Sequence, residues 1–202
     1  MKDNFIYGGI KMSKGIKTLI VVVAIIAIIF VPIIGSYNKI VGLDQSVKQS
    51  ESDIDTQLQR RSDLIPNLIA TVKGYAAQEK SIFIALADAR AKLAGAQTIT
   101  EKANADSQLS GSLSRLLVVV ENYPNLKSDQ NFRDLSVSLE GTENRINIAR
   151  KDYNSIVGQF NSVTKTFPNS ITAGIFRFDQ KPYYKAADGA KEVPKVDFST
   201  GK

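Results

Sequence analysis

The sequence predicts an all-α protein in which an N-terminal transmembrane helix is followed by an up-down-up-down antiparallel four-helix bundle and an extended C-terminal tail. Three observations lead to this prediction: one long apolar run near the N-terminus, apolar residues that recur at alternating steps of three and four, and short connections between the periodic segments. The predicted boundaries are a basic cytoplasmic N-terminus at residues 1–18, a transmembrane signal-anchor at 19–35, the bundle at 36–167, and the tail at 168–202, whose residues 186–202 we expect to be loosely ordered.

The anchor is predicted from residues 19–34, which carry no polar side chain and with their flanks make a run of about 20 residues, the length that crosses a bilayer. A helix that is apolar on every face has only lipid or a large protein core to surround it. Four lysines and one aspartate precede the run, so the positive-inside rule places the N-terminus in the cytoplasm and residues 36–202 outside it. We therefore predict a single-pass protein of the cytoplasmic (inner) membrane.

Two alternatives concern the same segment. A cleaved signal peptide has a similar basic start, but this apolar run is longer than a usual signal-peptide core and no A-x-A cleavage site follows it. Met12 begins the sequence MSKGIK, which resembles the start of a shorter signal-anchor. Met12 is therefore a second candidate for the initiator, with residues 1–11 as an extension. We favour an uncleaved anchor.

The first two predicted bundle helices are joined by residues 60–67. The first helix continues from the membrane along an apolar face, and a second apolar seam runs through residues 65–93, with Glu79 among its positions. Asp63 as an N-cap puts Pro66 in the first turn of the second helix, where its missing N–H costs little. We favour a chain reversal here, and the alternative is one kinked, continuous helix.

The third and fourth predicted helices have clear start signals. Thr98 and Glu101 form a capping box ahead of the third helix. The fourth helix carries an unbroken heptad seam over residues 132–167, with N-cap signals at Ser128 and Asp129. Short connections between long helices imply antiparallel neighbours, which leads to the up-down-up-down order.

The composition excludes several classes of chemistry. The chain has no cysteine and no histidine, so it can form no disulfide, no Ser-His-Asp triad and no zinc site with cysteine or histidine ligands. It contains no glycine-rich nucleotide-binding motif. Residues 1–18 hold half of the net charge of +6 and the rest is spread without a basic stripe, which argues against nucleic-acid binding. We expect no cofactor and no catalysis.

Seven charged residues are candidates for an interaction site or an ion-pair network. Glu79 is a carboxylate on an apolar seam, so it must be paired, protonated or exposed at a gap. Inward carboxylates also occur in di-iron bundles, but those sites need histidines, so we expect no metal. Arg60, Arg61 and Asp63 form either a solvated, capped helix end or a docking corner. The candidates are Arg60, Arg61, Asp63, Glu79, Arg90, Glu143 and Arg150.

A short sequence echo links two parts of the predicted bundle. Tyr37-Asn38 recurs as Tyr153-Asn154, and in an up-down bundle both pairs lie at the end next to the membrane. The echo reflects either shared packing needs or a paired Tyr/Asn layer. The apolar residues 171–178 start near the same end, where they either seal the base of the bundle, dip into the membrane interface or cover a partner.

Several separated segments of the chain resemble the LemA family. In order, they are residues 55–69 (DTQLQRRSDLIPNLI), 72–76 (VKGYA), 121–127 (ENYPNLK), 140–146 (EGTENRI), 149–154 (ARKDYN), 167–169 (FPN) and 194–198 (PKVDF). Two positions depart from the family pattern: Glu51 stands where the family often has a tryptophan, and Gln78 where it often has a histidine.

The resemblance implies a bacterial single-pass membrane protein with an extracytoplasmic helical domain, and it carries over no catalytic residue. A related domain in a magnetosome-membrane protein points to membrane organisation. Frequent gene neighbours, a heat-shock-type zinc metalloprotease and a small TPM-domain membrane protein, point to envelope maintenance.

We therefore expect a membrane-anchored extracytoplasmic helical adaptor or scaffold for cell-envelope or membrane organisation, with an envelope protein as partner and no nucleic acid. Exposed seam residues are also compatible with a homo-oligomer. One alternative is a sensor-type module that binds a ligand or peptide in a cavity near Glu79, Arg90 and Glu143. Another is a hydrolase that uses carboxylates and loses activity on Glu79→Gln.

Overall fold

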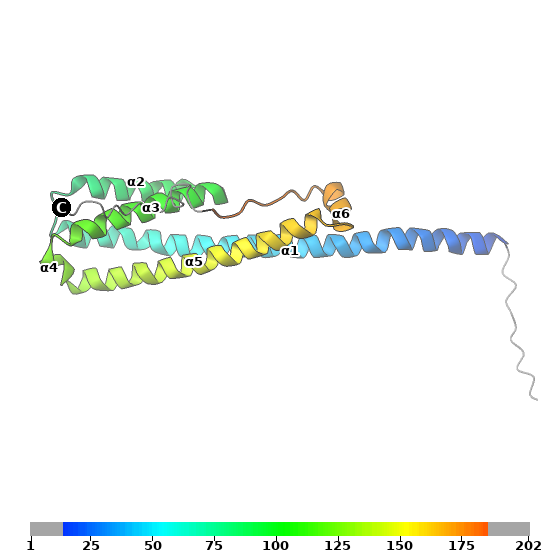
Figure 1. Cartoon of the computed structure of the whole chain (residues 1–202), viewed down its shortest axis with the longest axis horizontal. Coiled ribbons are helices and arrows are strands. Elements are labelled where there is room, and N and C mark those ends of the chain that lie inside the picture. Colours follow the sequence, from blue (N-terminus) through cyan, green and yellow to red (C-terminus); the bar gives the residue numbers. More distant parts are fainter. Residues whose placement is uncertain (1–13, 186–202) are drawn as a thin grey trace, which may run out of the picture. The chain divides into compact units, whose positions relative to one another are not determined.

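The computed structural model describes residues 14–185, and every regular element in that range is a helix. The helices follow one another along the chain as α1 (Lys14–Lys73), α2 (Lys80–Gly95), α3 (Ile99–Val120), α4 (Pro124–Lys127), α5 (Gln130–Lys165) and α6 (Asn169–Phe176) (Figure 1). The prediction of an all-α chain with an apolar N-terminal helix is confirmed, and residues 14–185 contain no strand.

The described chain divides into two compact units. The smaller unit comprises residues 14–42 and 163–179, and the larger unit comprises residues 43–162 and 180–185. Helices α1 and α5 each contribute one segment to each unit.

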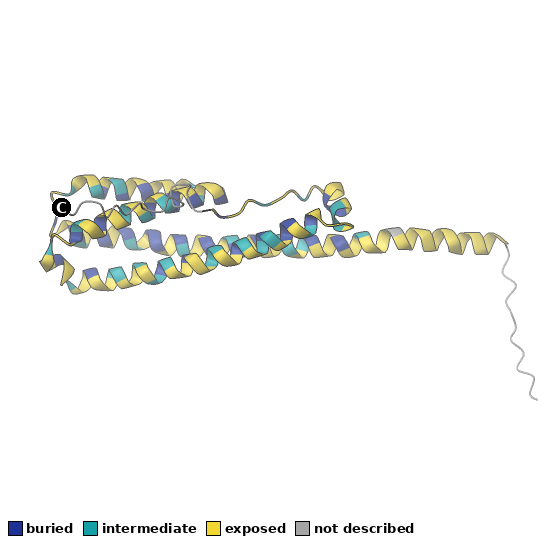
Figure 2. Cartoon of the chain, viewed as in Figure 1, coloured by how far each residue is buried: buried dark blue, intermediate teal, exposed yellow. Residues whose placement is uncertain are grey.

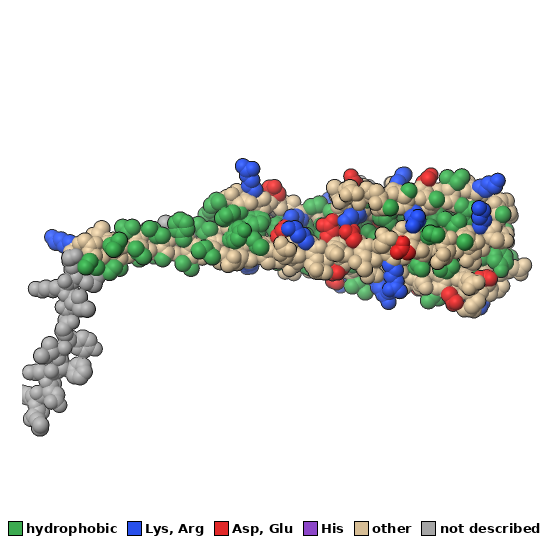
Figure 3. Space-filling model, turned by 180° about the vertical axis from the view of Figure 1, so that it is seen from behind, with side chains coloured by type: hydrophobic (Ala, Val, Ile, Leu, Met, Phe, Trp, Pro, Cys, Tyr) green, Lys and Arg blue, Asp and Glu red, His purple; other side chains and the backbone are tan. Residues whose placement is uncertain are grey.

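The smaller unit contains the apolar stretch of α1, residues 19–34. Its large apolar side chains are mostly exposed, with Ile28 at 72%, as the yellow ribbon in Figure 2 and the green side chains in Figure 3 show. The most apolar window of this helix has a mean hydropathy of 3.1, and none of that window is buried within the protein. Because water solvates such a surface poorly, the helix is long and apolar enough to cross a membrane, which fits a membrane protein.

Helix α6 packs against α1 within the smaller unit. The Ser36 hydroxyl donates a hydrogen bond of 2.7 Å to the side-chain carbonyl of Asn169. The ring of Tyr37 lies against the rings of Phe176 and Phe178, with centroids 4.7 and 5.9 Å apart. These contacts place α6 beside the end of the apolar stretch of α1.

The prediction of an extended tail is wrong for residues 169–176, which form α6. Only Thr172 and Ala173 are buried in this helix, so its inner face is too short to produce a helical period in the sequence. Residues 180–185 are not helical, and residues 186–202, predicted to be loosely ordered, lie outside the described residues.

The larger unit is built around apolar stripes that α1, α2, α3 and α5 turn inward. The stripes follow the three-and-four spacing expected of helices that bury one face. Their buried members include Ile54, Leu58, Ile65, Leu68 and Val72 from α1, Phe83, Leu86 and Leu93 from α2, Leu109 and Leu116 from α3, and Phe132, Ile146, Tyr153, Val157 and Phe160 from α5.

The predicted chain reversal at residues 60–67 is wrong. Helix α1 runs through this stretch to Lys73, and the chain turns instead between α1 and α2, at residues 74–79. Asp63 is therefore an exposed residue inside α1 and not an N-cap. The apolar stripe continues across the stretch in regular steps, so the burial of that face stabilises one uninterrupted helix.

Pro66 is tolerated inside α1 because another side chain replaces the hydrogen bond it removes. A proline has no N–H, which leaves the carbonyl four residues earlier, that of Ser62, without its helical partner. Arg90 of α2 donates its Nε–H to this carbonyl at 3.0 Å. Pro66 itself faces outward, so its ring meets no core residue.

The start signals of the third and fourth predicted helices are confirmed. The Glu101 backbone N–H donates to Thr98 Oγ1 at 3.2 Å, and the Thr98 backbone N–H donates to Glu101 Oε2 at 3.0 Å, so the capping box at the start of α3 is complete. At the start of α5, Asp129 accepts a hydrogen bond of 3.0 Å from the backbone N–H of Phe132.

Candidate functional site

A cluster of charged side chains lies inside the larger unit. We call it the buried charge cluster, and it consists of Arg61 from α1, Asp106 from α3, Glu143 and Arg150 from α5, and Tyr184 from the segment that follows α6. Arg61 is 2% exposed and Asp106 is fully buried. Both are inward because they occupy stripe positions: Arg61 lies between Leu58 and Ile65, and Asp106 lies between Ala103 and Leu109.

Asp106 is the centre of the buried charge cluster. Its Oδ1 accepts a hydrogen bond of 2.6 Å from Nη1 of Arg61, and its Oδ2 accepts one of 2.8 Å from the hydroxyl of Tyr184. Arg150 forms an ion pair with the same Oδ2, and its guanidinium lies 5.1 Å from the centre of the Tyr184 ring. Arg61 also pairs with Glu143. Two arginines thus meet two carboxylates, so the cluster carries no net charge.

Burial dominates the electrostatics of the cluster. It lowers the pKa of the Arg61 guanidinium, and the charge of Asp106 opposes this shift. Burial also raises the pKa of the Tyr184 hydroxyl, and the negative charge of Asp106 raises it further. Tyr184 is therefore a neutral hydrogen-bond donor to Asp106. Removing either partner of such a buried pair leaves the other charge uncompensated. The free-energy cost of that change exceeds the net stabilisation that the intact pair provides.

The segment that carries Tyr184 is held on α5 by two asparagines. Asn154 accepts from the backbone N–H of Tyr184 at 2.8 Å and donates to its carbonyl at 2.9 Å. Asn161 makes the same pair of bonds with Lys181, at 2.8 and 2.9 Å. Seven helical residues and three extended residues both span about 10 Å, so the two asparagines match the two backbone sites.

Two further contacts fasten this segment. The Tyr153 hydroxyl donates to the carbonyl of Pro182 at 2.9 Å. Lys181 reaches Asp44 of α1 at 2.8 Å. Burial alone raises the pKa of the Asp44 carboxyl, but hydrogen bonds and charge from Lys181 and Lys48 outweigh it and hold the pKa below its usual value.

A cavity of about 500 Å³ opens beside the buried charge cluster, between α1, α3 and α5. Arg61 and Glu143 form its charged end, and the rest of its wall is mostly leucine and serine. The other lining residues are Leu68, Ser110, Leu113, Ser114, Leu117, Ser136, Leu139 and Glu140. Its size and its few polar groups are within the range of small-molecule sites.

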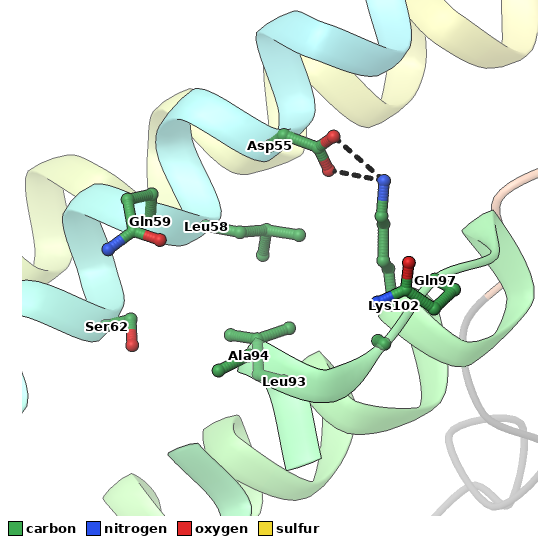
Figure 4. A pocket seen from close by; sticks show the side chains of 9 residues that line it. Asp55, Leu58, Gln59, Ser62, Leu93, Ala94, Gln97 and Lys102 are labelled. Carbon is green, nitrogen blue, oxygen red and sulfur yellow. Dashed lines mark hydrogen bonds and ion pairs between the residues drawn. The ribbon is translucent and has the colours of Figure 1, made fainter. Parts of the chain in front are cut away.

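A smaller hollow of about 240 Å³ lies between α1, α2 and the start of α3 (Figure 4). Figure 4 shows Lys102 reaching across it to Asp55, with 2.8 Å from Nζ to each carboxylate oxygen. Lys102 also lies 3.1 Å from Glu51. Burial lowers the pKa of Lys102, but the hydrogen bonds to Asp55 and Glu51 outweigh it and raise the pKa overall. The charged groups of this hollow are thus engaged with one another.

Three of the seven predicted charged residues meet in the buried charge cluster: Arg61, Glu143 and Arg150. Arg60 is exposed on α1, and Asp63 accepts a hydrogen bond from Gln59 at 2.7 Å. These two residues do not join the cluster.

Glu79 and Arg90 also lie outside the cluster. Glu79 is not on a helical seam, because it precedes α2 in the loop after α1, where it accepts a hydrogen bond of 3.2 Å from the Tyr123 hydroxyl. Arg90 bonds the Ser62 carbonyl. A cavity was expected near Glu79, Arg90 and Glu143, and of these three residues only Glu143 lines the cavity described above, together with Arg61.

The predicted Tyr/Asn layer is divided between the two units. Tyr37 and Asn38 belong to the smaller unit, where Tyr37 packs on aromatic rings of the same unit and Asn38 is exposed. Tyr153 and Asn154 belong to the larger unit and hold the segment after α6. The pairing of the two halves stays a prediction.

Sequence reasoning missed two members of the cluster, Asp106 and Tyr184. Asp106 could have been found in the same way as Glu79, as an acidic residue at a position of an apolar stripe. Ala103, Asp106 and Leu109 are spaced by three, so the apolar stripe of α3 includes the position of Asp106. Tyr184 carried no such signal, because its segment has no period and its place depends on α5 side chains.

The described residues contain no group of three or more acidic side chains arranged to hold a metal ion. Both acids of the buried charge cluster are paired with arginine. As it stands, this arrangement can join three helices and the segment after α6 through one set of charge-assisted hydrogen bonds.

Comparison with known proteins assigns the family. The family model described as the LemA family matches residues 50–198. The magnetosome proteins MamQ 1 and MamQ 2 of Paramagnetospirillum magneticum are each 23% identical over 206 residues, which cover 87% of this chain and 75% of those proteins. Protein LemA of Metamycoplasma hominis is 24% identical over 178 residues, covering 88% of this chain and 80% of that protein.

Proposed function

Because the chain belongs to the LemA family, we propose that it is a membrane-tethered helical scaffold, whose larger unit is an up-down-up-down four-helix bundle presented to a protein partner outside the cytoplasm. In this proposal the chain performs no catalysis and contributes to the organisation of the membrane or cell envelope. The family names and the names of the relatives given above do not describe an enzyme, which supports this choice.

One observation carries the proposal: a single helix, α1, contains both a membrane-length apolar stretch and an inward stripe of the larger unit. The lysines before residues 19–34 favour retention of the N-terminus in the cytoplasm. A helix that is both anchor and core element tethers the larger unit without a separate linker. The relatives named as magnetosome proteins support a role at a membrane-associated structure for this chain as well.

Photocrosslinking in cells tests the scaffold. A photoreactive amino acid is placed in the full-length chain at exposed apolar positions of the larger unit, such as Val118 and Val137, and adducts are identified by mass spectrometry. We expect the same membrane or envelope protein to recur at neighbouring positions. Ile28, inside the apolar stretch, is the matched control and has to give no adduct with that protein. A full scan of the larger unit without a recurrent partner overturns the proposal.

The orientation has its own test. The chain has no cysteine, so Val137→Cys creates a single reactive thiol in the larger unit. In intact cells, a membrane-impermeant maleimide reacts with it if the larger unit lies outside the cytoplasm. Labelling that appears only after the cells are broken contradicts this orientation.

The cavity beside Arg61 favours a second candidate function, a sensor-type module that binds a small ligand or peptide. The substitution Leu117→Trp enlarges a side chain that lines this cavity. Native mass spectrometry of the gently extracted full chain should then show a bound molecule on the original protein and none on the variant. An unoccupied original protein, extracted in the same way, excludes this candidate.

A further inference from the structure

The outer face of α6 is apolar and uncovered. Ile171 and Ile175 are four residues apart and therefore lie on one side of this helix, and Phe167 lies in the turn just before it. Phe167 is 77% exposed and Ile175 is 61% exposed. Contacts within the smaller unit use the other side of α6, where Thr172 and Ala173 are buried. Burying three such side chains away from water is strongly favourable. We therefore expect lipid or another protein surface to cover this face.

The position of α6 in the smaller unit points to lipid as that occupant. The Ser36–Asn169 hydrogen bond and the contacts of Tyr37 with Phe176 place α6 at the level of residues 36 and 37 of α1. A hydrocarbon core of about 30 Å takes about 20 helical residues, so it ends at about residue 36 when it is centred on the apolar stretch. Helix α6 therefore lies at the outer boundary of the hydrocarbon.

The polar surroundings of α6 match a lipid headgroup layer. In residues 35–42 and 163–179 the charged side chains are Lys39, Lys165, Arg177 and one acid, Asp179. The excess of positive charge favours anionic lipids. The rings of Tyr37 and Phe176 pack against each other at an interplanar angle of 55°, and tyrosine is enriched at membrane interfaces.

We propose that α6 is an interfacial helix, which inserts Phe167, Ile171 and Ile175 into the outer boundary of the bilayer beside the transmembrane part of α1. The inference rests on the membrane anchorage proposed above and extends it. The chain then holds the membrane at two points, the transmembrane helix and α6. Two points of contact restrict rotation and tilt of the smaller unit relative to the membrane plane, which a single helix does not do.

Site-directed spin labelling of the full chain tests this inference, because the absence of cysteine permits single-label variants. Ile171→Cys and Ile175→Cys are labelled with a nitroxide and reconstituted into vesicles of phosphatidylcholine and phosphatidylglycerol. Ile148→Cys is the matched control, because Ile148 of the larger unit has the same exposure as Ile175, 61%. Ile28→Cys reports on the anchor itself.

We expect the labels at positions 171 and 175 to keep contact with oxygen, which dissolves in lipid, and to lose most of their contact with a water-soluble nickel chelate. The label at position 148 should remain open to the chelate. If position 28 is open to the chelate, the anchorage proposed above is wrong. If position 28 is protected while positions 171 and 175 behave like 148, only the interfacial helix is wrong.

Protection from both oxygen and the chelate at positions 171 and 175 also overturns the inference, because it shows a protein neighbour in place of lipid. Broadening of the spectrum by nearby labels then identifies a second copy of the chain. Circular dichroism confirms that each variant is folded. As a second measurement, replacing phosphatidylglycerol by phosphatidylcholine should move both labels toward water, and Lys165→Glu with Arg177→Glu should abolish this lipid dependence while position 28 stays protected.

Discussion

Two stretches of α1 show how one helix is adapted to two surroundings. Residues 19–34 are apolar on every face and almost none of their side chains meets another part of the protein. Residues 54–72 are apolar along one stripe only, and this stripe is buried together with a charged residue, Arg61. The backbone conformation is the same in both stretches, so the difference lies in what surrounds the side chains.

The comparison teaches why a charge is placed in one stretch and not in the other. Arg61 finds two carboxylates, Asp106 and Glu143, on neighbouring helices. A charge within residues 19–34 has no such partner among the described residues, and in the proposed membrane span it would meet only lipid, where it is costly. Burial of Arg61 therefore depends on specific carboxylates from other helices, whereas residues 19–34 need no partner within the protein.

The largest expected effect comes from removing the centre of the buried charge cluster. Asp106→Ala leaves the buried Arg61 and the half-buried Arg150 without their shared carboxylate, which should lower the free energy of unfolding by about 4 kcal/mol. Urea unfolding of the full chain in detergent micelles, followed by circular dichroism, measures this loss. Asp63→Ala, which removes an exposed acid from α1, is the control and should cost less than about 0.5 kcal/mol. Equal losses contradict the proposed role of the cluster.

The other half of the comparison is tested by placing a charge in the apolar stretch. Ile28→Arg should disfavour membrane insertion by about 3 kcal/mol, because lipid offers the guanidinium no carboxylate. The measurement is the fraction of protein that resists alkaline extraction from membranes. Ile148→Arg, at an exposed position of the larger unit, should leave that fraction unchanged. Equal effects of the two substitutions remove the distinction between the two stretches.

A smaller effect is expected where α5 holds the segment after α6. Asn154→Ala removes both hydrogen bonds to the backbone of Tyr184 and should cost about 2 kcal/mol. Hydrogen exchange of the Tyr184 amide should accelerate, while amides in the middle of α3 stay protected. Asn144→Ala, an exposed asparagine of the same helix, serves as the control. Unchanged exchange at Tyr184 shows that the segment is held by other contacts.

The bond between Arg90 and the Ser62 carbonyl is expected to contribute about 1 kcal/mol, which Arg90→Ala should remove. The contribution should shrink in a Pro66→Ala background, because that substitution restores the backbone N–H that the carbonyl lacks. A double-mutant cycle by urea unfolding measures the coupling. Independent effects of the two substitutions refute the compensation.

The smallest expected effect is a pH dependence. Burial raises the pKa of Tyr153 to about 12, and the charge of Glu51 adds to the shift. Above the ordinary tyrosine pKa the unfolded chain loses this proton and the folded chain keeps it, so stability falls as pH rises toward 12. Between pH 9 and 10.5 the loss due to Tyr153 should be about 0.8 kcal/mol. Tyr153→Phe should flatten the curve by that amount, and parallel curves contradict the shift.

Much of the fold was predictable because a helix that buries one face leaves a regular three-and-four spacing of apolar residues in the sequence. The apolar stretch, the capping box at Thr98 and Glu101, and the long seam of α5 were all read correctly. The reversal at residues 60–67 was wrong because a local signal, Pro66, was weighed above the continuity of the stripe. The compensating bond comes from Arg90 on another helix, which no local pattern reveals.

The candidate site was only partly predictable for a similar reason. Arg61, Glu143 and Arg150 were predicted as candidates for an interaction site or ion-pair network, but Asp106, the common partner of the two arginines, was not. Glu79 looked similar in the sequence and proved to lie in a loop.

The sequence by itself determined that the chain is helical, where one helix becomes apolar enough for a membrane, and to which family the chain is related, because these properties depend on composition and on neighbours within a few turns. Only the tertiary structure decided where α1 ends, which charges meet around Asp106, and how Asn154 and Asn161 hold the segment of Tyr184. Those outcomes depend on side chains from different helices that satisfy one another's buried polar groups, and such pairings become visible only when the helices are packed.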